Sequence, residues 1–135
     1  MNIIPPIRET DSQGSGYFGA PRGSRTHNGV DVACYNGSGI FPVIEGEVTK
    51  IGYPYNPNNE KKGHLRYIQV TDVTGRDWRY FYVLPSAKVG DYVTITDIIG
   101  IAQGLSDIYP DITDHIHVEI KIDGEFIDPT EYVFS

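Results

Sequence analysis

Short segments in which β-branched and aromatic residues recur run through most of the chain. Residues 30–35, 46–51, 66–73 and 77–84 have this composition, which favours strands. Val73-Thr-Gly-Arg-Asp77 predicts a hairpin turn between the last two segments. Residues 88–93 predict another turn that leads into a strand, and residues 93–100 predict a strand, a turn and a further strand. Since no segment has the periodicity of a long helix, we expect an all-β, mainly antiparallel fold, with at most a helical turn near 106–109 or after Pro129.

The clearest alternation lies near the C-terminus, in Asp114-His-Ile-His-Val-Glu-Ile-Lys-Ile122. A strand here would place His115, His117 and Glu119 on one face and the intervening isoleucines and valine on the other, toward a core. Two imidazoles on the same face can both reach one small site. An exposed strand face that happens to carry two histidines would give the same pattern, so the motif alone leaves both interpretations open.

A polar, glycine-rich segment, residues 11–24, precedes the first predicted strand and leads into His27-Asn-Gly-Val-Asp31. Loops of this length inside a compact domain are usually functional or disordered. Gly29 and the β-branched residues after it disfavour a helix, but a turn followed by a strand can still aim His27 and Asp31 at one point. Imidazole nitrogen and carboxylate oxygen are zinc ligands. Together with the two histidines near the C-terminus, the motif predicts a shared metal site.

Composition and charge narrow the function classes. A chain of 135 residues, 39% of them hydrophobic, is expected to form one domain with a sizeable core. Its net charge of -7 argues against nucleic acid or an anionic membrane as the main partner. No apolar stretch is long enough to span a bilayer, and the N-terminus lacks the pattern of a secretory signal. The single cysteine, Cys34, excludes an intrachain disulfide framework and is expected to be a small buried residue.

Motifs in a fixed order resemble the lysostaphin-type, or LytM-like, family of zinc endopeptidases that cleave peptidoglycan. The first motif is Phe18-Gly-x-x-Arg22 followed by His27-x-Gly-Val-Asp31, and the last is His115-x-His-x-Glu119. Between them, Gly46-Glu-Val-x-x-Ile-Gly52 and Val89-Gly-Asp-x-Val93 with Ile99-Gly resemble turns of the family's β core. The resemblance covers residues 14–129. It implies a single peptidase-like domain over residues 1–135, with 1–13 as an N-terminal extension and long loops around a zinc cleft.

The same resemblance implies roles for individual residues. His27, Asp31 and His117 would bind zinc, and His115 would be a catalytic histidine. Three protein ligands leave an open position for a water molecule, which zinc activates. Glu119 would orient a ligand histidine through its second ring nitrogen. The implied function is a zinc-dependent endopeptidase that acts on peptidoglycan peptides at the bacterial cell wall, as a secreted, periplasmic or virion-associated protein. The oligomeric state is left open.

The segment from Tyr80 to Leu84 departs from the family's pattern, in which Tyr-x-His-Leu supplies a further catalytic histidine. Aligned on Tyr80 the histidine position falls on Tyr82, and aligned on Leu84 it falls on Val83. A tyrosine is a poor base at neutral pH, but its hydroxyl can donate a hydrogen bond to a developing oxyanion. Tyr82 is therefore a catalytic candidate. The alternative is a catalytically inactive zinc-binding module of the peptidase fold that binds peptide or protein.

Other segments resemble further branches of this fold. Phe81-Tyr-x-x-Pro85 and Tyr109-Pro-x-Ile-x-x-His-x-His117 are similar to the vertebrate leukocyte chemotaxin branch, which is regarded as zinc-binding and without demonstrated peptidase activity. The several disulfides typical of that branch are ruled out by the single cysteine. Gly14-Ser-Gly-Tyr-Phe-Gly-Ala-Pro-Arg-Gly23 and Phe81-Tyr-Val83 resemble peptidase-like domains of bacteriophages, which favours a phage or bacterial origin.

Two residues are candidates for substrate binding. His64, in a loop before a predicted strand, either is solvated or lines the cleft and partly replaces the missing histidine. Arg22 and its neighbour Arg25 are expected near the entrance of the site, where they either bind a substrate carboxylate or solvate the loop.

Overall fold

A computed structural model describes residues 18–19, 21–22, 25–26, 28–106, 108–109 and 112–133, with the backbone alone at 21–22, 25–26 and 133. The predicted extension, residues 1–13, and the predicted ligand His27 lie outside these residues. The division of the chain into an extension and a core therefore stays a prediction.

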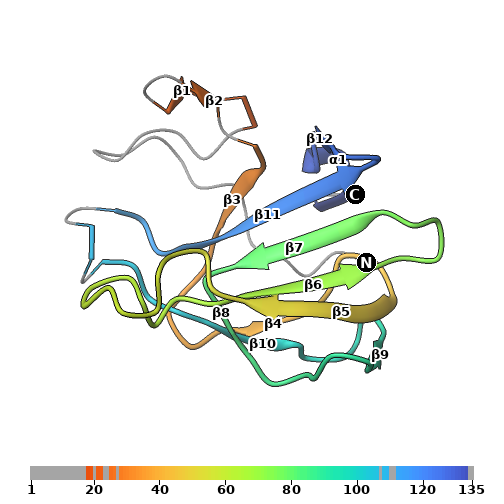
Figure 1. The fold of residues 1–135 in the computed structure, drawn as a ribbon, viewed down its shortest axis with the longest axis horizontal. Coiled ribbons are helices and arrows are strands. Elements are labelled where there is room, and N and C mark those ends of the chain that lie inside the picture. Colours follow the sequence, from red (N-terminus) through yellow and green to blue (C-terminus); the bar gives the residue numbers. More distant parts are fainter. Residues whose placement is uncertain are drawn as a thin grey trace.

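The largest sheet contains seven strands, and all its pairings are antiparallel. The path β12-β11-β7-β6-β5-β9 runs across it, and β3 pairs with β11 (Figure 1). The strands are β3 (Val30–Ala33), β5 (Gly46–Gly52), β6 (Tyr67–Thr71), β7 (Asp77–Phe81), β9 (Tyr92–Val93), β11 (His115–Ile122) and β12 (Glu125–Ile127). The expected all-β, mainly antiparallel fold is confirmed.

Smaller elements complete the described fold. A three-stranded antiparallel sheet joins β4 (Gly39–Ile40), β10 (Gly100–Ala102) and β8 (Val83–Pro85), and β1 (Pro21–Arg22) pairs with β2 (Arg25–Thr26). The expected helical turn after Pro129 is present as α1 (Thr130–Val133). Near the other expected position, the amide of Tyr109 donates to the carbonyl of Leu105 at 2.9 Å.

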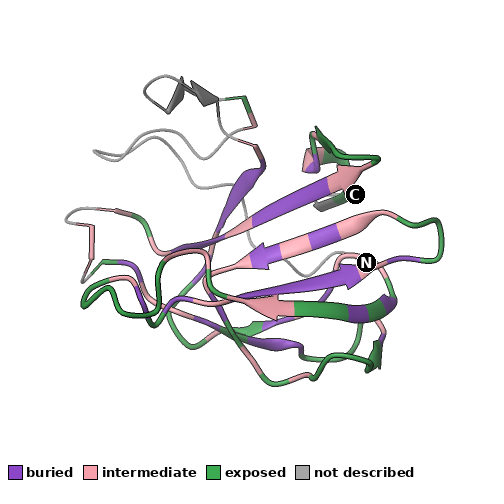
Figure 2. Cartoon of the chain, viewed as in Figure 1, coloured by how far each residue is buried: buried purple, intermediate pink, exposed green. Residues whose placement is uncertain are grey.

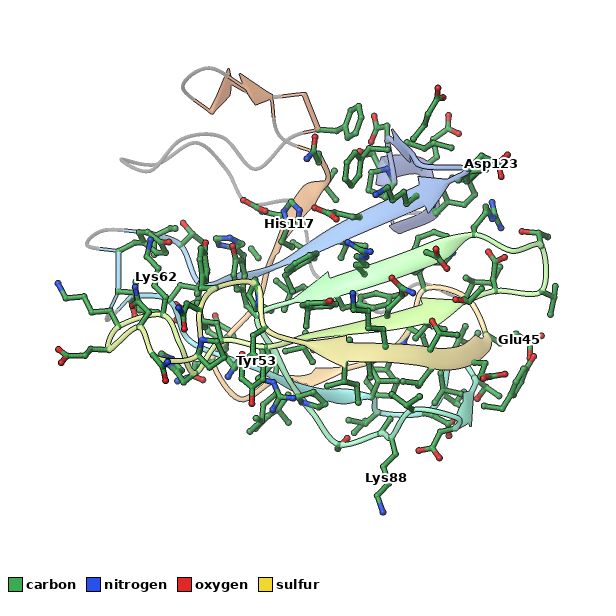
Figure 3. All side chains as sticks on the ribbon, in the orientation of Figure 1. Glu45, Tyr53, Lys62, Lys88, His117 and Asp123 are labelled. Carbon is green, nitrogen blue, oxygen red and sulfur yellow. The ribbon has the colours of Figure 1, made fainter. Side chains whose placement is uncertain are left out.

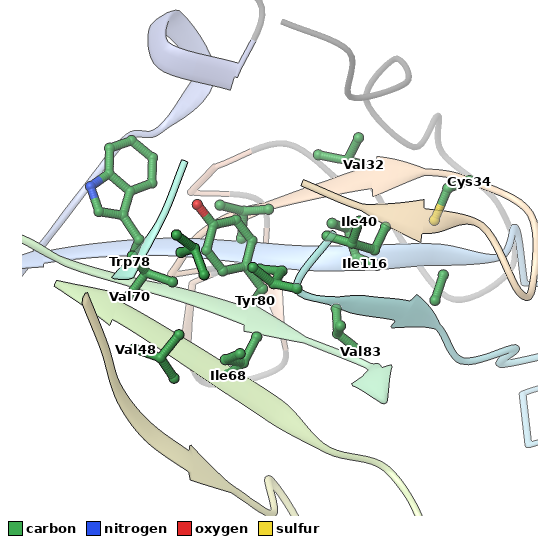
Figure 4. Close-up of a cluster of buried hydrophobic side chains, with 14 of the residues drawn as sticks. Val32, Cys34, Ile40, Val48, Ile68, Val70, Trp78, Tyr80, Val83 and Ile116 are labelled. Atoms are coloured by element: carbon green, nitrogen blue, oxygen red, sulfur yellow. The ribbon is translucent and has the colours of Figure 1, made fainter. Parts of the chain in front are cut away.

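The core lies on one face of the seven-stranded sheet and is completed by the smaller sheet (Figures 2 and 4). On β11, Ile116, Val118 and Ile120 are buried, as the alternation predicted. Burial raises the pKa of Cys34 to about 11, so its thiol is the inert, buried group expected. The other face of β11 therefore remains for the histidines.

The hairpin between β6 and β7 is closed around a buried carboxylate, Asp72. Its Oδ1 accepts hydrogen bonds from the backbone amides of Thr74 and Arg76 at 2.9 and 3.1 Å. Its Oδ2 accepts from Arg76 Nε at 2.8 Å and from the indole of Trp78 at 3.0 Å. The hydroxyl of Thr74 also donates to Oδ1, at 2.6 Å. Burial by itself would raise the pKa of Asp72, but the Thr74 hydroxyl and the other donors lower it far below its usual range. The predicted turn at 73–77 is thus fixed by one ionised side chain.

The prediction of a single strand over 77–84 is wrong, because the chain breaks at Tyr82 and its two halves join different sheets. Tyr82 has a φ of 66°, a left-handed conformation that non-glycine residues rarely adopt. The carbonyl of Arg66 accepts from the amides of both Tyr82 and Val83, at 2.8 and 3.3 Å. Because Tyr82 and Val83 share one partner, Arg66, the chain forms a bulge here, which changes the direction of the side chains that follow.

Candidate functional site

The site is built on β11 and its neighbours β3 and β7. His117 lies opposite Asp31 of β3 and opposite Phe81 of β7, so alternation along all three strands brings these side chains to the polar face of the sheet. The turn before β3 approaches β11 so closely that a Cβ on Gly29 would meet the carbonyl oxygen of Val118 at 2.1 Å. Glycine is therefore required two residues before Asp31 for the chain to enter β3 here.

His117 is held between two carboxylates (Figure 3). Its Nδ1 lies 2.9 Å from Asp31 Oδ1, and its Nε2 lies 2.9 Å from Glu119 Oε1. Burial alone would lower the pKa of His117, but the hydrogen bonds to Asp31 and Glu119 raise it to about 9. The two carboxylates therefore favour positive charge at this position, which an imidazolium supplies and which a bound cation would supply equally well.

His115 lies beside this pair and is almost fully buried. Its Nδ1 lies 2.7 Å from the carbonyl oxygen of Thr113, and because a carbonyl only accepts, that nitrogen carries the proton. Its Nε2 lies 3.4 Å from Asp31 Oδ2 and is the nitrogen that faces the site. The ring is thus oriented by the backbone in one tautomer, as a residue that exchanges protons at Nε2 requires.

Tyr82 is the residue that the bulge turns toward His115. The two rings meet edge to face, with centroids 5.7 Å apart. Val83, the other residue onto which the family histidine could align, is fully buried in the core. Burial, reinforced by Tyr55, raises the pKa of Tyr82 well above its usual range. The phenol therefore stays protonated and can act only as a donor or neutral acceptor at neutral pH.

The remaining predicted residues are less fully placed. His64 is exposed, and its carbonyl accepts a hydrogen bond from Gln103 Nε2 at 2.8 Å. Arg22 has a described backbone in β1, paired with Arg25, but its side chain is not described. Within the described residues no group of three or more His, Cys, Asp or Glu side chains is arranged to hold a metal ion, and His27 lies outside them. The complete ligand set and both substrate-binding residues stay predictions.

Prediction from the sequence missed a group of tyrosines next to Tyr82. Tyr55 comes from the loop between β5 and β6, and its hydroxyl lies 3.4 Å from that of Tyr109, in the segment before β11. Tyr55 also lies close enough to Tyr82 to raise the pKa of that phenol. The ammonium of Lys62 lies 5.0 and 4.9 Å from the ring centroids of Tyr55 and Tyr109. Only Tyr109 stood in a motif, so no sequence signal joined these residues.

Solved structures with this architecture define the class of fold. The catalytic domain of lysostaphin, the antimicrobial peptidase of Staphylococcus simulans, is similar with a TM-score of 0.66 and 23% identity over 90% of this chain and 91% of that chain. A solution structure of lysostaphin has a TM-score of 0.67 and 20% identity, covering 98% of this chain but only 55% of that one, about half its length. The fold is that of lysostaphin-type peptidase domains.

Sequence relatives narrow the identification to a family. The chain is 33% identical over 129 residues to leukocyte cell-derived chemotaxin-2 of Mus musculus, covering 94% of this chain and 79% of that protein. The Bos taurus protein of the same name is 30% identical over the same shares. This chain belongs to the leukocyte cell-derived chemotaxin-2 family. No family model matches it, and no helix among the described residues is long and apolar enough to cross a membrane.

Proposed function

We propose that the chain is a zinc-dependent endopeptidase that binds its metal through His27, Asp31 and His117. One observation carries the proposal: the His117 imidazole is held between the carboxylates of Asp31 and Glu119 at 2.9 Å on each side. Nitrogen and oxygen donors in this combination suit zinc, and a carboxylate on the second nitrogen of a ligand histidine is its usual orienting partner.

His115 and Tyr82 would supply the proton chemistry of peptide hydrolysis. Bound zinc would polarise the scissile carbonyl and lower the pKa of water from about 15.7 to near 7. Nε2 of His115 faces the site and would accept a proton from that water and return it to the leaving amine. The protonated hydroxyl of Tyr82 would donate a hydrogen bond to the carbonyl oxygen as it becomes negative.

The substrate we propose is a peptidoglycan peptide, cleaved at the bacterial cell wall. Support comes from the fold, which the chain shares with the catalytic domain of an antimicrobial peptidase. The net charge of -7 also makes a polyanion an unsuitable partner. Secreted, periplasmic and virion-associated locations would all give access to this substrate.

The test combines metal analysis with a wall-digestion assay. Purified protein is expected to carry near one zinc per chain, and the zinc-loaded protein should release peptides from cell walls. His115→Ala should keep its zinc and lose hydrolysis, whereas Lys88→Ala, a control at an exposed position with no proposed role, should keep both. A zinc-free wild type, or one no faster than His115→Ala on several wall types, would refute the proposal.

A second function is favoured by the residue beside His115. Where active members of the resembled family carry a histidine, this chain places Tyr82, and its relatives are named as chemotaxins. In this alternative the chain is a zinc-binding module that binds peptide without cleaving it. Two variants separate these functions. If the chain is a binding module, the wild type does not hydrolyse peptide and Tyr82→His gains hydrolysis. If the chain is a peptidase that uses Tyr82, Tyr82→Phe loses about two to three powers of ten in rate.

A further inference from the structure

We propose that Lys62 and the Tyr55–Tyr109 pair form a subsite that binds a carboxylate of the peptide held at the Asp31–His117 site. The inference rests on the proposed function in one respect, that peptide binds there. It does not require that the peptide is cleaved.

Neighbouring side chains lead from one place to the other. His115 Nε2 lies 3.4 Å from Asp31 Oδ2, and the His115 ring meets the ring of Tyr82 edge to face. Tyr55 and Tyr109 lie close enough to Tyr82 to raise the pKa of its phenol. Tyr55 continues to Tyr109, and the Lys62 ammonium lies against the faces of both rings. Three separate loops deliver these groups. A ligand that contacts His115 and Tyr82 would therefore lie next to the tyrosines that carry the Lys62 ammonium.

Hydrogen bonds and close backbone packing hold the loop that carries Lys62. Oδ1 of Asn59 accepts hydrogen bonds from the backbone amides of Lys61 and Lys62, at 3.0 and 2.9 Å. A Cβ on Gly63 would meet the carbonyl oxygen of Pro57 at 2.3 Å, so the loop closes tightly on itself.

A side chain from outside the loop fixes its far end. The side chain of Gln103 donates to the carbonyl of His64 at 2.8 Å and accepts from the amide of Arg66 at 2.9 Å. Because the loop is already ordered, binding a ligand to it costs less conformational entropy.

Charge and chemistry select a carboxylate as the ligand. Among the described residues Lys62 makes no ion pair, although carboxylates abound in a chain with net charge -7. The tyrosine rings hold the ammonium by cation–π attraction without neutralising it. The hydroxyls of these two rings lie 3.4 Å from each other and can donate to the same anion. A peptide offers this chemistry at its C-terminus or at an acidic side chain.

The experiment compares three peptides by isothermal titration calorimetry with the zinc-loaded protein. They are pentaglycine with a free C-terminus, pentaglycine amide, and Gly-Gly-Glu-Gly-Gly amide; where a peptide is cleaved, KM replaces the affinity. The free acid, the glutamate peptide or both should bind about fivefold more tightly than pentaglycine amide, the strength of a partly exposed charge pair. Which acid gains identifies the source of the carboxylate.

Variants then assign the preference to Lys62. Lys62→Met should remove it, Lys62→Arg should keep most of it, and Lys61→Met, the same charge change at the adjacent exposed position, should leave it intact. Equal affinity of wild type for acids and amide overturns the subsite but leaves peptide binding standing. Failure of all three peptides to bind removes the peptide site and the subsite together. A preference that survives in Lys62→Met also overturns the assignment.

Discussion

Two aspartates are equally buried, one on strand β3 and one in the hairpin that joins β6 to β7, but they have different hydrogen-bonding partners. The partners, rather than the burial, distinguish the structural acid from the proposed functional one. Asp31 is 3% exposed and Asp72 is 4% exposed. Asp72 accepts hydrogen bonds from two backbone amides, the hydroxyl of Thr74, an indole and a guanidinium. Asp31 faces the imidazoles of His115 and His117, whose protons can move. One site is fixed in a single charge state, and the other can exchange a proton or a cation.

The largest expected effect comes from deleting the fixed acid. Asp72→Ala leaves the indole of Trp78 and the guanidinium of Arg76 without their acceptor, which should cost about 3 kcal/mol of unfolding free energy. Urea denaturation measures the change, with Glu60→Ala, at an exposed loop position, as the control. The variant that still folds should bind zinc like wild type. Coupled loss of zinc would mean that the two acids are not independent.

Lowering the pH should remove part of the same unfolding free energy. Folding lowers the pKa of Asp72, so its contribution is present above the unfolded value of about 3.9 and is lost as the pH falls below it. Wild type should therefore lose stability between pH 5 and pH 2 more steeply than Asp72→Ala. Urea midpoints measured across this range test the difference. Parallel curves for the two proteins would show that Asp72 does not titrate with unfolding.

Deleting the exchangeable acid should act on the metal instead. Asp31→Ala removes a proposed ligand and should lower zinc affinity at least about a hundredfold, since even partners of ligands are worth ten- to a hundredfold. Competition with a chromophoric chelator measures the affinity, and Asp72→Ala serves as the control because its carboxylate is equally buried. Unchanged zinc affinity in Asp31→Ala would end the distinction between the two acids.

The sequence predicted what depends on alternation and missed what depends on distant contacts. The two faces of β11 follow from period two, so His115, His117 and Glu119 were placed correctly on one face. The bulge at Tyr82 depends on the carbonyl of Arg66, which directly precedes β6, and no local pattern marks it. Lys62 and Tyr55, on the loop between β5 and β6, meet Tyr109 from the segment before β11, a contact between distant segments that periodicity does not describe.

The smallest effect should come from Glu119, which lies behind His117 rather than in the proposed ligand set. Glu119→Gln keeps a hydrogen-bond acceptor for His117 Nε2 but removes the charge, so zinc affinity should fall about tenfold with little change in stability. The same chelator competition measures it, with Glu125→Gln on the exposed strand β12 as the control. If affinity stays at the wild-type value, the Glu119 carboxylate does not tune His117 as a ligand. The preference of this site for a cation would then depend on Asp31 alone. The comparison with Asp72 would involve a single carboxylate at each site.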